Sequence, residues 1–222
     1  AYQAAIDAGN PSAMRKLAQL LIDGDGVPRD LDRAITLLEQ AIDNGEARSA
    51  GDALGQLYQA DTPLKDPAKA ARYFEEAGAA GNPSALRRLA ELLIQGVEYP
   101  ADPARAEALL TRAIEMGDAY GAGRDLGDLY RSEGGGEASA AALDAYRVAA
   151  EAGNPAAAIT AARMLSEEIG NPAARREEIA LWRKAAEEIG EENVAVEMLS
   201  QPPNALVAAL QQMLSDQVVP IG

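Results

Sequence analysis

The sequence predicts an all-α fold, a solenoid of about five tandem helix pairs of ~36 residues each. Three observations point to this class. Alanine and leucine recur along all 222 residues while aromatic residues make up only 4%, a composition that favours thin layers of helix on helix over a sheet. Glycines return at a fixed interval, and helix-capping residues follow them.

The glycine interval defines the repeat. A glycine ends each predicted helical stretch at steps of 36, 36, 36, 36 and 37 residues. The sequence also has a second, longer period of 72 residues. The segment GNPSAMRKLAQLLIDG, which begins at Gly9, recurs as GNPSALRRLAELLIQG, which begins at Gly81. This pattern indicates duplication of a two-repeat block. The glycines are Gly9, Gly45, Gly81, Gly117, Gly153 and Gly190.

Capping residues explain where the helices begin. Glycine tolerates the left-handed conformation that ends a helix, asparagine caps the next one, and proline suits its first position. This Gly-Asn-Pro order places caps at Asn10, Asn82 and Asn154. Second helices begin in the same way at Asp66-Pro67, Asp102-Pro103 and Asn171-Pro172. Each repeat is therefore a first helix (helix A), a short loop, a second helix (helix B) and a glycine.

Apolar spacing sets the predicted domain organisation. In the first full repeat, alanine and leucine recur at helical spacing on one face of each helix, so neighbouring helices must stack to bury them. The predicted solenoid covers residues 1–199. Residues 200–222 are expected to form a degenerate repeat or a C-terminal capping helix, with 205–214 as its helical part. The repeats are 10–45, 46–81, 82–117, 118–153 and 154–190, after the tail of a truncated repeat at 1–9.

The repeat resembles the Sel-like repeat family, a relative of the tetratricopeptide (TPR) repeats. The shared elements are an L-G-x-L-Y helix A at Leu54–Tyr58, a G-x-G-V loop at Gly24–Val27, a D-x-x-R-A start at Asp30–Ala34 and an A-x-x-x-G end at Ala41–Gly45. The resemblance implies a right-handed superhelix that serves as an adaptor, often in bacterial envelope assembly, exopolysaccharide secretion or signalling. A cysteine-rich subgroup has been linked with β-lactam binding, which is not carried over because this chain has no cysteine.

The net charge of the chain restricts the classes of partner that it can bind. The net charge of −15 repels nucleic-acid phosphates and anionic membranes, and no apolar run is long enough for membrane insertion. We expect a protein or peptide segment as the partner, with end-to-end self-association of the repeats as a further possibility. The first residues read as the end of a helix, so we expect the chain to begin inside a longer protein. The resemblance favours a periplasmic or secreted location over the cytoplasm.

The residue inventory argues against an enzyme. The chain has no histidine, which removes the commonest general base and metal ligand and any serine or cysteine nucleophile activated by one. A hydrolase using a carboxylate pair is the remaining enzymatic alternative, but adjacent pairs such as Glu177-Glu178 are interpreted as solvated. We therefore predict no catalytic, cofactor or metal site. A carbohydrate-binding or polysaccharide-export adaptor is a third alternative, which would require exposed aromatic side chains.

The polar side of helix A, on the concave surface in this family's architecture, is the predicted partner-binding site. One interpretation is arginine–carboxylate pairing within each helix, and the other is a groove for a carboxylate-bearing segment anchored by Arg15, Arg87 and Arg124. We call these positions the helix A stripe. They lie two residues before and two after the leading leucine: Arg15, Gln19, Asp52, Gln56, Arg87, Glu91, Arg124 and Asp128.

Overall fold

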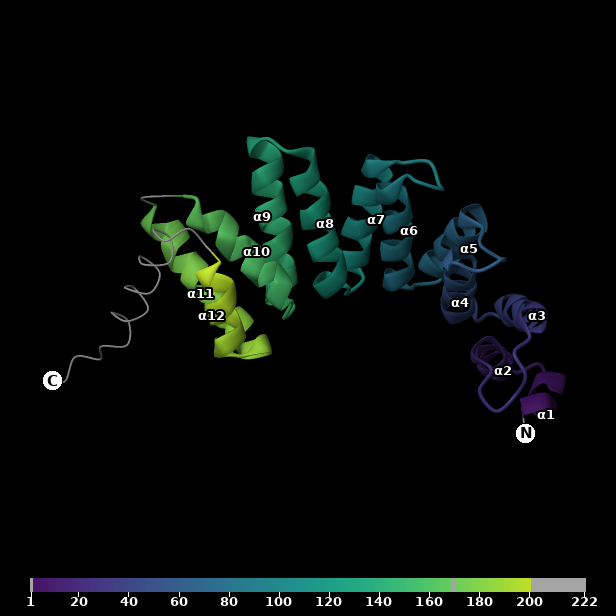
Figure 1. The fold of residues 1–222 in the computed structure, drawn as a ribbon. Helices are drawn as coiled ribbons and strands as arrows, with labels where there is room; N and C mark the ends of the chain where they lie inside the picture. Colours follow the sequence, from purple (N-terminus) through teal and green to yellow (C-terminus); the bar gives the residue numbers. More distant parts are fainter. Residues whose placement is uncertain (1, 169–170, 201–222) are drawn as a thin grey trace. The chain divides into compact units, whose positions relative to one another are not determined.

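The computed structural model describes residues 2–168 and 171–200, with the backbone alone at 137 and 138, and in this part of the chain it consists of twelve α-helices and no strand (Figure 1). The all-α prediction is confirmed. The predicted capping helix at 205–214 lies outside the described residues. The helices are α1 (Tyr2–Asp7), α2 (Pro11–Asp23), α3 (Leu31–Asp43), α4 (Ala47–Gln59), α5 (Pro67–Ala79), α6 (Pro83–Gln95), α7 (Pro103–Glu115), α8 (Ala119–Glu133), α9 (Gly136–Glu151), α10 (Pro155–Ser166), α11 (Pro172–Ile189) and α12 (Glu191–Leu199).

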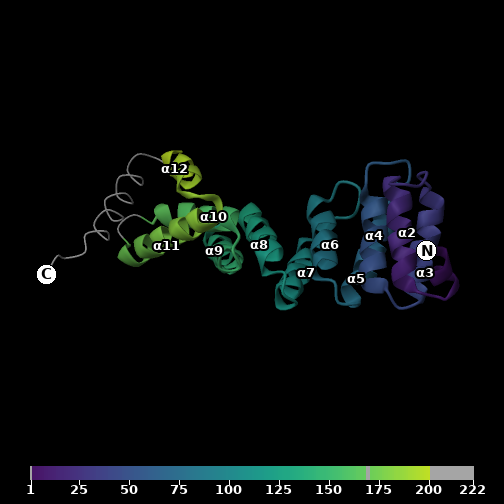
Figure 2. The same ribbon diagram turned by 90° about the horizontal axis from the view of Figure 1, so that it is seen from below.

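The helices fall into two compact units that divide between Gly117 and Asp118. In the first unit each helix from α1 to α7 packs against the next, and the pairs α2/α3, α4/α5 and α6/α7 are helices A and B of successive repeats (Figures 1 and 2). In the second unit α8/α9 and α10/α11 are such pairs, and α12 packs on α11. None of the described helices combines the length and the apolar character that a membrane span needs.

The asparagine caps form as predicted and also tie repeats together. The side-chain oxygens of Asn10, Asn82 and Asn154 accept hydrogen bonds from backbone N–H groups three residues later. The amide nitrogen of Asn82 also donates to the carbonyl of Arg48, 34 residues earlier, at 2.8 Å. That of Asn154 donates to the carbonyl of Tyr120 at 2.7 Å. An asparagine at these positions therefore links its own helix A to helix A of the preceding repeat within one unit.

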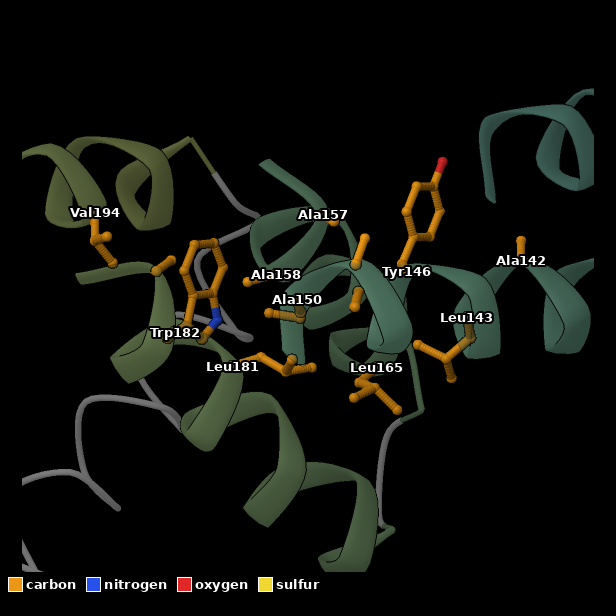
Figure 3. Packing of buried hydrophobic residues seen from close by; sticks show 14 of the residues in the cluster. Ala142, Leu143, Tyr146, Ala150, Ala157, Ala158, Leu165, Leu181, Trp182 and Val194 are labelled. Atoms are coloured by element: carbon orange, nitrogen blue, oxygen red, sulfur yellow. The ribbon is translucent and has the colours of Figure 1, made fainter. Parts of the chain in front are cut away.

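Small residues let the two helices of a pair approach closely. A side chain at Gly55 of α4 would place its Cβ 2.4 Å from the ring of Phe74 on α5, and Gly127 of α8 faces Tyr146 of α9 in the same way at 2.7 Å. The second unit's core is built from α9, α10, α11 and α12 and includes the buried Trp182 (Figure 3).

The interpretation of Glu177-Glu178 as a solvated pair is wrong for Glu178, whose side chain is only 2% exposed. Successive helical residues point about 100° apart, so one carboxylate faces outward and its neighbour faces the core. Glu177 bonds Arg147 of α9, while Glu178 lies 2.6 Å from Nη1 of Arg175. Burial raises the pKa of Glu178 above its ordinary value, and the Arg175 guanidinium opposes this rise.

Candidate functional site

The helix A stripe is distributed over α2, α4 and α6 in the first unit and α8 in the second. Its residues are engaged with neighbouring side chains. Arg15 Nε lies 2.7 Å from Oε1 of Glu46, and Ser12 Oγ donates to the other carboxylate oxygen at 2.9 Å. Because Glu46 precedes α4, this ion pair joins two repeats. The predicted pairing within one helix therefore has the wrong partner at Arg15, and Gln19 bonds Asp23 one turn along.

At the next junction, between α4 and α6, the acidic and basic partners of the ion pair are exchanged: the earlier repeat supplies the carboxylate and the later repeat the guanidinium. Asp52 of α4 supplies the carboxylate, and its Oδ1 lies 3.3 Å from Nε of Arg88 on α6. Both atoms are buried and their geometry is not that of a hydrogen bond, so the contact is ionic. The other oxygen of Asp52 accepts from Gln56 at 2.7 Å. The cation at this junction is thus Arg88, which the stripe did not include, while the neighbouring Arg87 also has a partner.

In the second unit the pairing stays largely within α8. Arg124 lies 3.4 Å from Asp125 and 3.9 Å from Asp128 one turn later. Asp128 also accepts a 2.6 Å hydrogen bond from the hydroxyl of Tyr146 on α9. Burial, together with this bond, raises the pKa of Tyr146 well above its ordinary value. In the first unit, Glu91 of α6 accepts a hydrogen bond from Gln95 one turn along.

One inter-repeat pair on helix A was missed from the sequence. Arg163 of α10 bonds Glu197 of α12 and lies 2.9 Å from Ser200 Oγ. Arg163 stands at the position that holds Gln19 in the first repeat, two residues after the leading apolar residue, which is Ala161 here. The helix A stripe was not extended to this repeat, in which Ala161 replaces the leucine. Whether the helix A stripe binds a partner stays a prediction.

A cleft of about 410 Å³ lies elsewhere, between two helices B of the first unit, α3 and α5. Its wall includes the ring of Tyr73, whose hydroxyl donates a 2.9 Å hydrogen bond to Oε1 of Glu39. The guanidinium of Arg72 lies 4.5 Å from the centre of that ring. Burial and the bond to Glu39 raise the pKa of Tyr73 to about 12, so it remains a hydroxyl donor at neutral pH. The lining residues are Glu39, Ile42, Asp43, Arg72, Tyr73 and Glu76.

At the cleft, the side-chain bridge between helices B differs from the bridges on either side of it. Arg33 of α3 reaches Gln3 of α1, and Arg105 of α7 reaches Glu75 of α5, each across 30 residues. The corresponding cation between α3 and α5 is Lys69. Its Nζ instead lies 4.9 Å from the ring centre of Tyr58 and 3.8 Å from Asp66, while the Tyr73 hydroxyl binds Glu39.

Sequence reasoning did not find this cleft. The only signal was the tyrosine at 73, where the preceding and following repeats carry Leu37 and Leu109. Tyr73 is buried, stacked on Tyr58 at 5.8 Å between ring centres, as expected for a core residue. Its hydroxyl nevertheless reaches the cleft. Among the described residues, no group of three acidic, histidine or cysteine side chains is placed to hold a metal ion.

The model of the family described as Sel1 repeat matches residues 11–46, 53–82 and 83–118, which correspond to the helix pairs α2/α3, α4/α5 and α6/α7. Residues 11–118 therefore contain three matches to the Sel1 repeat. This confirms the family resemblance read from the motifs. No curated protein sequence matches the chain.

Solved structures of Sel1 and TPR proteins share the fold. A protein described as c5321, a protective antigen present in uropathogenic Escherichia coli strains displaying an SLR fold, matches with a TM-score of 0.68 and 23% identity. The match covers 97% of this chain but only 54% of that one, so this chain spans about half of its length. A Sel1 repeat protein from Oxalobacter formigenes matches with a TM-score of 0.70 and 21% identity, over 95% of this chain and 89% of that one.

A third structure, described as YrrB, a TPR protein with an unusual peptide-binding site, matches with a TM-score of 0.52 and 20% identity. The match covers 90% of this chain and 98% of that one. At these identities the comparisons establish the Sel1-like arrangement of helices, and not the ligand.

Proposed function

We propose that the chain is a non-enzymatic scaffold that binds a polypeptide partner, and that a cationic side chain of the partner enters the cleft between α3 and α5. The observation that carries the site is the cleft itself, which lies where Lys69 does not form the bridge that Arg33 and Arg105 form at the neighbouring junctions. The peptide-binding site in the description of YrrB supports the class of partner.

Charge and shape favour lysine or arginine. The cleft presents the carboxylates of Glu39, Asp43 and Glu76 against one guanidinium, that of Arg72. The aliphatic stem of a long basic side chain fits against Ile42 and the Tyr73 ring, while its head reaches the carboxylates. The net charge of −15 would also steer a basic segment toward the protein.

The test is an NMR titration of the ¹⁵N-labelled protein with a short acetylated peptide that contains two arginines. The matched peptide has norleucine in their place. We expect saturable shift changes in the amides of α3 and α5 with the arginine peptide only. Because a hydrogen bond to a charged group is worth about 1.5–3 kcal/mol, removal of the three carboxylates should weaken binding about tenfold or more. The test variant is Glu39→Gln/Asp43→Asn/Glu76→Gln.

A control variant with the same change in net charge separates the cleft from diffuse attraction. Glu133→Gln/Glu151→Gln/Glu187→Gln removes three exposed carboxylates of the second unit. Binding should be unchanged in this variant. Equal weakening in both variants, or shift changes confined to α2, α4 and α6, would contradict the assignment to the cleft. Failure to capture any protein partner from the native organism would contradict the scaffold function itself.

The helix A stripe is proposed as a second contact, for an acidic segment of the partner. Its test is replacement of Arg15, Arg87 and Arg124 with glutamate, with partner capture and thermal stability measured together. Loss of capture with an unchanged melting temperature supports the contact. Because Arg15 is paired with Glu46, the variant is expected to lose some stability, and the single change Arg15→Gln shows how much.

We also propose that the assembly belongs to the bacterial envelope, in the periplasm or outside the cell, as part of envelope, exopolysaccharide or signalling machinery. Fractionation of the native organism with an antibody to this chain tests the compartment, and recovery in the cytoplasm would contradict it. For the carbohydrate-binding alternative, Tyr120 at the start of α8 is an exposed aromatic side chain on a helix A. Glycan-array binding that is lost in Tyr120→Ala would favour that alternative.

A further inference from the structure

Helix α12 is apolar on two sides. Val194 and Met198 are buried against α11 and belong to the core of the second unit, where Figure 3 places Val194 beside Trp182. Val196 and Leu199 point elsewhere, and their side chains are 66% and 68% exposed. Being three residues apart, these two side chains lie next to each other and form an exposed apolar face on α12.

The repeat register identifies these two positions. Leu199 is the ninth residue of α12, as Gly55 is of α4 and Gly127 of α8. Both glycines face helix B of their own pair, since a Cβ on either would lie 2.4 Å from Phe74 on α5 or 2.7 Å from Tyr146 on α9. The eighth residues of the three helices, Leu54, Leu126 and Met198, are all buried, which supports this register.

Leu199 therefore occupies a helix A position that helix B covers in other repeats, and Val196 lies one turn before it on the same side of α12. In every described pair, helix B packs on the helix A that precedes it in the chain. Helix α12 follows a glycine and packs on the helix B before it, as a helix A does. It is thus the first half of a further pair.

We propose that residues 204–214 pack on the Val196–Leu199 face of α12 as helix B and complete a sixth helix pair. The connection has the required length: residues 167–171 join α10 to α11, and residues 200–204 are the same number between α12 and Ala205. Asn204 is a suitable N-cap. One face of the segment is apolar at helical spacing, with Leu206, Leu210, Met213 and Leu214.

A second copy of the chain is the competing occupant. A segment tethered by five residues has an effective concentration in the millimolar range, which exceeds the protein concentration in ordinary solutions. An antiparallel hairpin places a residue three positions before the end of α12 near one about five positions into the following helix. Val196 should therefore face Leu210 or, one turn away, Leu206.

Disulfide trapping tests this proposal in the full chain, which has no cysteine of its own. Val196→Cys is combined with Leu210→Cys in one variant and with Leu206→Cys in another, and each is oxidised under mild conditions. We expect at least one intramolecular disulfide, formed at a rate that does not depend on protein concentration. The matched control joins Leu210→Cys to Val97→Cys, which replaces a valine that is 85% exposed in the first unit, and it should keep free thiols.

Two outcomes of the disulfide experiment would overturn the proposal. Disulfide-linked dimers in place of the intramolecular product would assign the face to a second copy. Free thiols in both test pairs would show that the segment does not cover α12. As a separate readout, Leu206→Ser/Leu210→Ser should lower the melting temperature by about 5 °C or more, whereas Gln211→Ser/Gln212→Ser on the polar side should not. Equal melting temperatures for the two double variants would also contradict the proposal.

Discussion

At the scale of single residues, the asparagine caps make two contacts that can be separated by mutation. Asn82→Asp keeps a side-chain oxygen that can cap α6 but removes the N–H donor to the Arg48 carbonyl. We expect the free energy of unfolding to fall by about 1 kcal/mol relative to the control Asn10→Asp, measured by urea denaturation. The control variant gains the same favourable negative charge at a helix N-terminus. It does not lose a bond to a preceding repeat, because the acceptor would lie 34 residues before Asn10, outside this sequence. Equal effects in the two variants would contradict the link between repeats.

The buried carboxylate of Glu178 makes stability depend on pH. Its folded-state pKa is raised above the ordinary 4.5, so its contribution is most favourable below that value and is lost as pH rises through the folded pKa. Glu178→Gln does not titrate. Its melting temperature relative to the native chain should therefore improve between pH 4 and pH 7. Glu187→Gln, which replaces an exposed glutamate on the same helix, should show no such trend, and parallel curves for both variants would refute this role.

At the scale of helices, the close approach of α4 and α5 depends on Gly55. An added methyl group would overlap the Phe74 ring, whose nearest atoms lie 2.4 Å from the Cβ position. Gly55→Ala should therefore destabilise the protein by about 1–3 kcal/mol, although alanine favours helix by about 1 kcal/mol. Gly136→Ala at the start of α9, where no atom lies within 4 Å, should be neutral or stabilising. Thermal melts compare the two variants, and stabilisation by Gly55→Ala would show that the helices can separate freely.

Most helices could be predicted from the sequence because their signals are local. The glycine that ends a helix, the asparagine that caps the next and the proline at its first turn are neighbours in the chain. The contacts between repeats could not be read in this way. Arg15 reaches Glu46 across 31 residues, and at the next junction Arg88 is the cation where the sequence pattern favoured Arg87. Which residues pair between repeats depends on the rotation of one helix relative to the next and on the side-chain conformations.

The cleft between α3 and α5 was unpredictable for a related reason. The position of the cleft depends on the conformation of the Lys69 side chain, and the sequence places several possible partners within reach of this lysine. A lysine at the position of Arg33 and Arg105 predicts the same bridge to the preceding helix B. The stacked Tyr58 and Tyr73 rings provide an alternative contact, and Lys69 lies over one of them. Only the three-dimensional arrangement distinguishes these two outcomes.

At the scale of the whole molecule, the two compact units imply separable folding. Each repeat in a solenoid contacts only its neighbours, so residues 1–117 should form a helical, cooperatively melting protein when expressed alone. Residues 1–99 are the matched control, because they lack α7 and leave α6 uncovered. We expect a clearly lower melting temperature for this shorter chain, as judged by circular dichroism. A coil spectrum from residues 1–117 would show that the first unit depends on the second.

The hydrogen bonds from the asparagine caps to the preceding repeat allow the array to gain repeats by duplication. The donors Asn82 and Asn154 are 72 residues apart, and so are the carbonyls of Arg48 and Tyr120 that accept their bonds. Every residue type supplies a backbone carbonyl, so an arginine and a tyrosine serve equally well. A 72-residue block copied end to end therefore brings its own donor and finds an acceptor in whatever repeat precedes it. Gene duplication can extend the array without any compensating substitution at the new junction.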